Sequence, residues 1–474
     1  MRVRFGSGVL VVALAGCAPE RVSSGSGGAD GSSSGGTTDG GSGSSGSGSV
    51  ETSSGGDSVS VGSSDGSSSG SVESSGGADS SDGGPPPLQC GNGVVEGDEG
   101  CDDGNLDDGD ACDHDCVPTD AIVWSTEIPG VAGANDCAYR VAVSAQGVWV
   151  AGIVRDAQAA SDGLVARLDP DGALLWRADF DSQDHENDEA RGLALADDDT
   201  AYVGGAWEQN GSHTWLQRVE PDGTIAWAQE WFDGERGSES AVDLALVDGA
   251  PWLAAYLDAT GEPLLLRYGT DGVLVAADTL AVTPGQVLRP SDLESRAGAT
   301  WLFGLRHDEF FPGGPPTGLQ LGPDASIGTE LGVETFTDHP SDGGVSGALG
   351  PDGSLVLVSY DQPAGGETPT VRRFDPEGTL AAAWLIELDD QPEVEDVALD
   401  ANGDVIVAGR IGDAAWARRS DAEGALLWDR RHTPPGGDGR LEAVAIAPDD
   451  GAVIVAGCIA DAGGHAAWVR RYQP

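Results

Sequence analysis

The densest set of chemically active groups lies in CGNGVVEGDEGCDDGNLDDGDACDHDC, residues 90–116, which has ten carboxylates and no basic residue. Its cysteines have the spacing C-x10-C-x10-C-x3-C. In an exported chain, an even and dense cysteine set predicts disulfides that stabilise a segment too small for its own core. Three pairings are possible and the spacing does not choose among them. The four cysteines are Cys90, Cys101, Cys112 and Cys116.

The acidic side chains of this segment offer the oxygen ligands that Ca²⁺ prefers. No EF-hand spacing is present, so a solvated acidic loop is the alternative. Zinc held by thiolates is disfavoured because an oxidising compartment converts thiols to disulfides. Calcium is therefore the one cofactor that the sequence suggests. The candidate ligands are Asp102, Asp103, Asn105, Asp107, Asp108 and Asp110.

The motifs of this segment also resemble those of a known module. CGNG at Cys90, CDDGN at Cys101 and GDAC ending at Cys112 resemble the myxobacterial-type cysteine-rich repeat. The resemblance covers residues 88–118. It implies an extracytoplasmic surface module rather than an activity.

The N-terminus, MRVRFGSGVLVVALAGC, has a basic start and a short apolar run, Val9–Ala15. The run is too short to span a bilayer as a mature helix, so it predicts an export signal. Its end, LAGC, resembles the bacterial lipobox, which implies that residues 1–17 form a lipoprotein signal with diacylglycerol on Cys17. Ala18 implies, in the lipoprotein families, release to the outer membrane. A plain secretory signal with an incidental Cys17 is the alternative.

Residues 18–87 are dominated by Ser, Gly and Asp and have no aromatic residue. Such a composition buries too little apolar surface to offset chain entropy, so we expect a disordered linker. The chain as a whole has a formal charge of -55, and its 24 basic residues are all arginine. Nucleic acid is therefore excluded as a partner, because phosphate binding needs basic patches.

The motifs of the commonest enzymes are missing from the sequence. It has no H-E-x-x-H zinc motif and no G-x-S-x-G nucleophile elbow, and its seven histidines are scattered. Acid pairs are so frequent in this chain that they say little about acid–base chemistry. We therefore predict no catalytic residue.

From residue 119 onward the sequence repeats. The small residue that ends a V-x-V-A-G-like strand recurs at intervals of 53, 50, 49, 55, 50 and 48 residues. Each unit has an alternating strand, a Gly or Asp turn, the strand with the small residue, a variable loop, a strand ending in Arg, and a turn such as PDG before a fourth strand. Seven units of this length predict an all-β, seven-bladed β-propeller of four-stranded antiparallel blades. The small residues are Gly152, Gly205, Ala255, Gly304, Ser359, Gly409 and Gly457.

The last unit stops at VRRYQP, where its fourth strand should begin, and the missing piece is found at the front as PTDAIVW, residues 118–124. We therefore expect residues 119–474 to close into a ring through an N-terminal strand, which removes exposed sheet edges. Cys137 and Cys458 fall at the two sides of this seam on one face. A disulfide between them is expected, with two free buried thiols as the alternative.

Six units place an arginine at one register, and repetition in nearly every blade predicts a structural role, with the arginines pairing with acids between blades. A ligand site is instead expected among the long loops on one face. The loop RHDEFFPGGPPT is distinctive, and His307, Phe310 and Phe311 are either a contact patch or packed against a neighbouring blade. The six arginines are Arg167, Arg218, Arg267, Arg373, Arg419 and Arg471.

Over about 355 residues the units resemble bacterial surface β-propeller repeat proteins. The resulting hypothesis is a monomeric, lipid-anchored protein of the outer membrane or cell surface. Its propeller would be a non-catalytic binding or scaffolding domain for an envelope or extracellular protein or glycan. The alternative is an enzyme. D-x-x-G-x-x-x-W also resembles the quinoprotein tryptophan motif, and a polysaccharide-cleaving propeller would need paired carboxylates facing a cleft.

Overall fold

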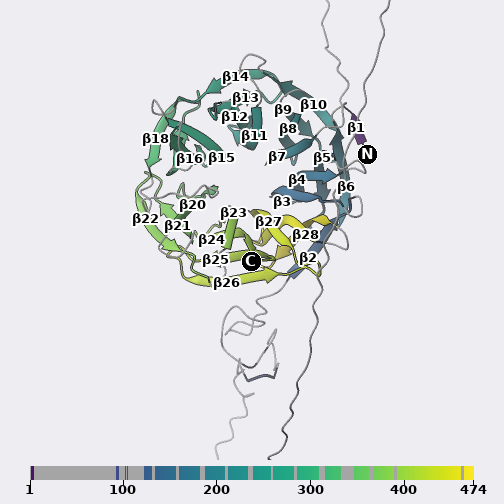
Figure 1. Cartoon of the computed structure of the whole chain (residues 1–474), viewed down its shortest axis with the longest axis vertical. Coiled ribbons are helices and arrows are strands. Elements are labelled where there is room, and N and C mark those ends of the chain that lie inside the picture. Colours follow the sequence, from purple (N-terminus) through teal and green to yellow (C-terminus); the bar gives the residue numbers. More distant parts are fainter. Residues whose placement is uncertain are drawn as a thin grey trace, which may run out of the picture. The chain divides into compact units, whose positions relative to one another are not determined.

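A computed structural model of the chain describes most of residues 122–474 and a few N-terminal positions (Figure 1). The gaps are 131–133, 156–159, 182–186, 209–211, 233–238, 258–259, 282–285, 309–314, 333–345, 362–367, 389–391 and 461–463, and the N-terminal positions described are 2–4, 92–94, 102 and 104. The predicted signal, linker and cysteine-rich module thus lie almost wholly outside the described residues. Within the described part, no helix is long and apolar enough to cross a membrane.

The described strands form the seven blades of a β-propeller around a central channel, as the repeat predicted (Figure 1). Within each blade the strands pair antiparallel from the channel outward. Blade 1 has β3 (Cys137–Ser144), β4 (Gly147–Arg155), β5 (Ser161–Leu168) and β6 (Leu174–Asp181). Blade 2 has β7 (Asp188–Leu195), β8 (Ala201–Glu208), β9 (Ser212–Val219) and β10 (Ile225–Trp231). Blade 3 has β11 (Glu239–Val247), β12 (Ala250–Leu257), β13 (Pro263–Tyr268) and β14 (Leu274–Thr279).

The remaining blades follow the same order. Blade 4 has β15 (Gln286–Arg296), β16 (Ala299–Asp308), β17 (Pro316–Leu321) and β18 (Ile327–Gly332). Blade 5 has β19 (Ser346–Leu349), β20 (Leu355–Asp361), β21 (Thr368–Phe374) and β22 (Leu380–Leu385). Blade 6 has β23 (Pro392–Leu399), β24 (Val405–Ile411), β25 (Ala414–Ser420) and β26 (Leu426–His432). Blade 7 has β27 (Gly439–Ile446), β28 (Val453–Ala460), β29 (His465–Tyr472) and, outermost, β2 (Ile122–Ile128). The short strand β1 (Arg2–Arg4) pairs in parallel with β6.

The two faces of the disk differ in their connections. The tight turns between first and second strands and between third and fourth strands lie on one face, which we call the turn face. The loops between second and third strands and the connections between blades lie on the other, which we call the loop face. All the gaps between described residues of the propeller, such as 209–211, fall in these loop-face connections.

The tryptophan that follows several PDG-type turns joins one blade to the next. The indole Nε1 of Trp176 in blade 1 donates to Pro221 O in the turn of blade 2, at 2.9 Å. The ring lies over Gly223, whose φ of +83° favours glycine. Trp227 repeats the contact with blade 3, donating to Thr270 O at 3.1 Å. The recurrent turn and tryptophan are therefore an inter-blade joint.

The small residue of the second strand is explained by a β-bulge in the first strand. A Cβ at Gly205 would collide with the carbonyl oxygen of Glu189, and one at Gly409 would collide with that of Glu393. Each carbonyl belongs to the strand segment just before the bulge. Glycine is used where the innermost strand passes this closely.

The ring closes with the N-terminal strand, as expected. β2 pairs antiparallel with β29, and Ile128 at its end is fully buried. Trp124 of β2 donates to Pro170 O of blade 1 at 3.0 Å, which is the same joint that links blades 1 and 2. The seam is also covalent. The predicted disulfide Cys137–Cys458 is formed, with the Cα atoms 4.7 Å apart across a sequence separation of 321.

Candidate functional site

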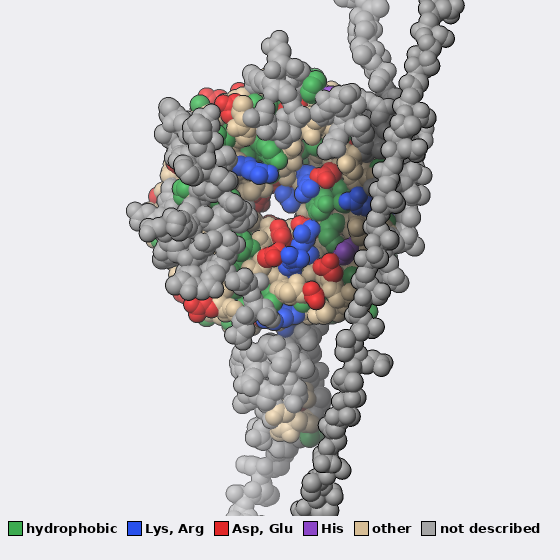
Figure 2. Space-filling model, viewed as in Figure 1, with side chains coloured by type: hydrophobic (Ala, Val, Ile, Leu, Met, Phe, Trp, Pro, Cys, Tyr) green, Lys and Arg blue, Asp and Glu red, His purple; other side chains and the backbone are tan. Residues whose placement is uncertain are grey.

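The bulges set a ring of residues around the middle of the central channel. In six inner strands the register shifts by one residue at the same place, and the residue after the shift comes to one level of the channel. Two of these positions are glycine or alanine sized, and four carry charge. The six are Arg140, Gly192, Asp243, Asp292, Asp396 and Ala443. Figure 2 shows Arg, Asp and Glu side chains gathered round the central opening.

Each aspartate of this ring binds the backbone of the following blade. The amide of Leu293 in blade 4 donates to Asp243 Oδ2 at 2.9 Å. The amide of Gly347 in blade 5 donates to Asp292 at 3.1 Å, and the amide of Val444 in blade 7 donates to Asp396 at 2.8 Å. Hydrogen bonds to charged groups contribute about 1.5–3 kcal/mol each. The carboxylates therefore act as clamps between inner strands.

Arg140 provides the compensating charge. Its Nε donates to Asp243 Oδ1 at 3.2 Å, and its Nη2 donates to Val242 O at 3.2 Å. Arg140 lies in blade 1 and Asp243 in blade 3, and blade 2 has Gly192 at this level. Burial alone would lower the pKa of Arg140, but the neighbouring carboxylates, with Asp243 and Asp292 first, raise it above its usual value.

The other acids of the channel hold protons more strongly than usual. Burial, with Asp243 within hydrogen-bonding reach, raises the pKa of Asp292 well above its ordinary value. Burial raises the pKa of Asp396 to about 6, although Arg140 and two backbone amides lower it. Burial and the charges of Asp243 and Asp396 raise the pKa of Glu294 to about 8, against a lowering effect of Arg296 and Arg140. Near neutral pH the cluster is therefore partly protonated.

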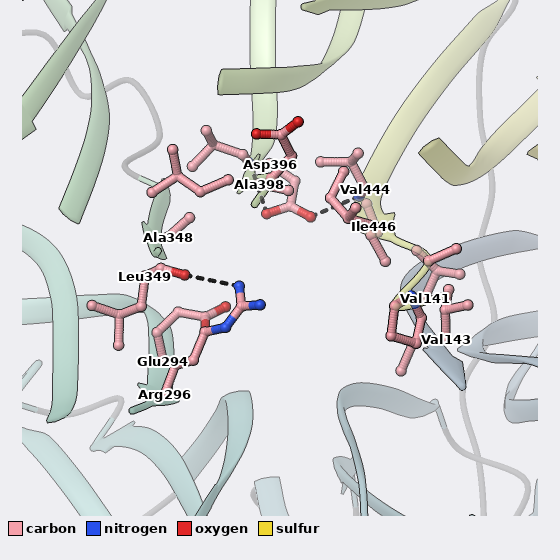
Figure 3. Close-up of a pocket in the computed structure, with 18 of the residues that line it drawn as sticks. Val141, Val143, Glu294, Arg296, Ala348, Leu349, Asp396, Ala398, Val444 and Ile446 are labelled. Atoms are coloured by element: carbon pink, nitrogen blue, oxygen red, sulfur yellow. Dashed lines mark hydrogen bonds between the residues drawn. The ribbon is translucent and has the colours of Figure 1, made fainter. Parts of the chain in front are cut away.

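Two cavities meet at this level. The turn-side cavity, of about 860 Å³, is lined by the later halves of the inner strands. Figure 3 shows Glu294 and Arg296 of β15 and Asp396 of β23 around it, with Arg296 Nη1 donating to Leu349 O at 3.2 Å. The loop-side cavity, of about 530 Å³, opens toward the loop face. Arg140 lines both cavities and so lies where they meet.

Glu294 makes the stability of the propeller depend on pH. Its pKa is about 8 in the folded chain against 4.5 ordinarily, so the folded state holds more protons between these values and the free energy of unfolding falls as pH rises through this window. We expect Glu294→Gln to raise that free energy by on the order of 2 kcal/mol at pH 9 and to leave it unchanged at pH 4. Urea unfolding across pH measures this, with the exposed Glu377→Gln as control. Parallel pH profiles for Glu294→Gln and the wild type would contradict it.

The recurrent arginines are structural, but the predicted pairing between blades is only partly right. Arg167 pairs with Asp199 of the next blade. In contrast, Arg218, Arg419 and Arg471 pair with acids in turns of their own blades. The reason is that the third strand of a blade ends beside the turn between its own first two strands. Arg267 and Arg373 do reach the next blade, where they donate to the carbonyls of Pro323 and Gly403.

The predicted ligand residues are only partly described. His307 lies at the loop-face end of β16 opposite Val287, but its side chain is not described, and Phe310 and Phe311 fall in the gap 309–314. Of the calcium candidates only Asp102 is described with its contacts. It accepts the backbone amides of Asn92, Gly93 and Gly104, which places it as a turn clamp. The other five candidates lie outside the described residues, so the calcium site stays a prediction.

Two described groups have the donor sets of a metal site. Cys137, Cys458 and Glu442 converge, but the two sulfurs form the seam disulfide and are not thiolate ligands. Asp162, Asp181 and Asp188 are all buried and bring one oxygen each within 4.8 Å of the others, where blade 1 meets blade 2. Their oxygens suit a hard cation.

No family model matches the chain, and no curated protein matches it in sequence. Three solved structures have a similar fold. The polysaccharide lyase Uly1 has TM-score 0.47 at 9% identity, covering 73% of this chain and 91% of that chain. Drosophila Semaphorin 1b, extracellular domains 1-2, has TM-score 0.44 at 10% identity, covering 75% and 87%. Sqt1 from Chaetomium thermophilum has TM-score 0.42 at 15% identity, covering 75% and 99%. With TM-scores below 0.5, these likenesses do not bear on what this chain binds.

Proposed function

We propose that the chain is a surface-tethered lipoprotein whose propeller is a non-catalytic binding or scaffolding domain. A lipid on Cys17 anchors it to the outer membrane or cell surface, and the linker 18–87 holds the propeller away from the membrane. The partner is an envelope or extracellular protein or glycan, bound at the loop face. This face carries the connections of variable length, and loops on a rigid scaffold are the usual place for binding residues.

The observation that supports a non-catalytic role is the bonding of the channel carboxylates. Acid–base catalysis needs carboxyl groups free to exchange protons with a substrate. Asp243, Asp292 and Asp396 instead accept amide hydrogen bonds from neighbouring blades. Their first role is therefore to hold the inner strands together.

The test uses the lipid-free full chain, immobilised and exposed to a glycan array and to cell-envelope extracts, with turnover assays on every glycan retained. We expect retention without product. Glu393→Arg, an exposed change on the loop face, should reduce retention at least about tenfold, because rim charges govern encounter with a partner. Asp171→Arg, an exposed change of the same charge on the turn face, should not. Equal loss in both variants, or no retained partner, would refute the proposal.

A polysaccharide-cleaving enzyme is the second candidate, because one observation favours it. Glu294 combines a pKa of about 8 with a place on the wall of the turn-side cavity, which suits a general acid. Product formed from a retained glycan, and lost in Glu294→Gln, would establish the enzyme and overturn the binding role. A quinone-dependent dehydrogenase would be recognised by the absorption band of its cofactor in the purified protein.

A further inference from the structure

The loop-side cavity has an unusual lining for so acidic a chain. Three arginines line it, Arg140, Arg191 and Arg289, against two glutamates, Glu189 and Glu395. The chain as a whole has 79 acidic residues and 24 basic ones. Between the charges stand the small polar side chains of Ser212, Ser240, Ser291 and Asn187. The wall of this cavity is thus locally cationic and rich in hydroxyl groups.

The three arginines are not equivalent. Arg140 is paired with Asp243 at 3.2 Å, and Arg191 with Glu189 at 2.7 Å. Arg289 has no carboxylate within ion-pairing distance among the residues that the structure describes. Arg289 therefore brings an uncompensated positive charge to the wall of the cavity.

Tyr256 holds the guanidinium of Arg289 in place. The guanidinium carbon lies 5.0 Å from the centre of the tyrosine ring, and Nη2 donates to the tyrosine hydroxyl at 3.2 Å. A guanidinium has five N–H donors, so this contact leaves a planar edge for another acceptor. Such an edge matches a carboxylate, which accepts two parallel hydrogen bonds.

A second polar group of the cavity points to a ligand independently. Ser291, two residues after Arg289 on β15, has a buried hydroxyl oxygen with no hydrogen-bond partner among the described residues. Leaving a buried hydroxyl unpaired costs about 1–3 kcal/mol. A ligand that carries a hydroxyl group could remove this cost.

We propose that the loop-side cavity binds a small hydroxylated carboxylic acid of the sugar-acid class, with its carboxylate on Arg289 and a hydroxyl on Ser291. A volume of about 530 Å³ lies within the range of small-ligand sites and admits a sugar ring. A single negative charge fits better than a polyanion, because a net charge of -55 repels a highly charged chain. The inference rests on the proposed binding function and names a ligand class for its loop face.

The experiment titrates D-glucuronate into the full chain by calorimetry, with D-glucose as the neutral match. We expect glucuronate to bind at least about tenfold more tightly than glucose, because charge-assisted hydrogen bonds add about 1.5–3 kcal/mol. Arg289→Gln should abolish this preference. Arg296→Gln is the matched control, since Arg296 is on the same strand and binds Leu349 O at the opposite end of the channel. It should leave binding unchanged.

Further arms separate the alternatives. Arg289→Lys keeps the charge but not the planar edge and should still lose affinity, and circular dichroism shows whether each variant is folded. Equal affinity for glucuronate and glucose, unchanged binding in folded Arg289→Gln, or tighter binding of an acidic tetrapeptide than of glucuronate would overturn the proposal. An oligogalacturonate that binds no more tightly than its monomer supports recognition of a single charged residue. If sugar acids fail while a loop-face partner is still retained, this inference falls and the proposed function stands.

Discussion

Deleting residues 119–128 is expected to lower the free energy of unfolding by more than about 5 kcal/mol and the melting temperature by roughly 10 °C. The deletion removes β2, the outer strand of blade 7, and with it the fully buried Ile128. It also removes Trp124 from its seat on Gly172 and uncovers Trp468, whose indole donates to Ser125. Calorimetry of the truncated and intact chains measures the loss.

Two point variants of the same strand provide the control. Val123 is 50% exposed, so Val123→Ala should change stability by less than about 0.5 kcal/mol. Ile128 is 0% exposed, and Ile128→Ala should cost about 2–5 kcal/mol. A truncated chain that melts no earlier than the intact one would show that the ring does not depend on β2.

Breaking the seam disulfide should have the next largest effect. Cys137→Ser removes a cross-link that closes a loop with a sequence separation of 321, and the chain-entropy model gives up to about 4–5 kcal/mol for so long a loop. We expect the same loss in Cys458→Ser, in the double variant and in the wild type under reductant. Denaturant unfolding with and without dithiothreitol measures it.

The comparison among these variants is informative. If the double variant were destabilised twice as much as either single variant, the two sulfurs would act separately. If reductant left the wild type unchanged, the thiols would not be linked in solution. In either case the covalent seam would be wrong, although the noncovalent joint made by Trp124 could remain.

The blade architecture was readable from the sequence because its signals are local and repeated. The PDG-type turn before Trp176 recurs before Trp227, and in the structure both tryptophans serve one joint. The tail that lacks a strand, VRRYQP, and the front segment that supplies one could be matched by the same pattern. Glycine at positions such as Gly205 was visible, but its cause, the carbonyl of Glu189, was not.

The channel ring was missed because a bulge sets its register. A strict alternation of sides along β23 does not account for the extra residue between Val394 and Asp396. A signal was nevertheless present, since aligning the inner strands puts Asp243, Asp292 and Asp396 at one register before an apolar residue. Arg140 appears in the same column, so a charge ring could have been inferred.

The loop-side cavity could not be predicted, because the residues that form it come from several blades. Arg289 and Tyr256 are adjacent only through the packing of blade 4 on blade 3, and the pairing state of each arginine depends on distances that the sequence does not contain. The exposed loop with Phe310 and Phe311 was conspicuous in composition, and its role remains a prediction.

Hydrogen exchange of the intact chain tests the closed ring most directly. β29 lies between β28 and β2, so both edges of the strand are hydrogen-bonded. We expect the amides of Trp468 to Arg471 to be protected throughout, to a degree similar to those of Val455 to Gly457 in β28. Rapid exchange of alternate amides along β29 would mean that its outer edge is open, and would contradict closure of the propeller by the N-terminal strand.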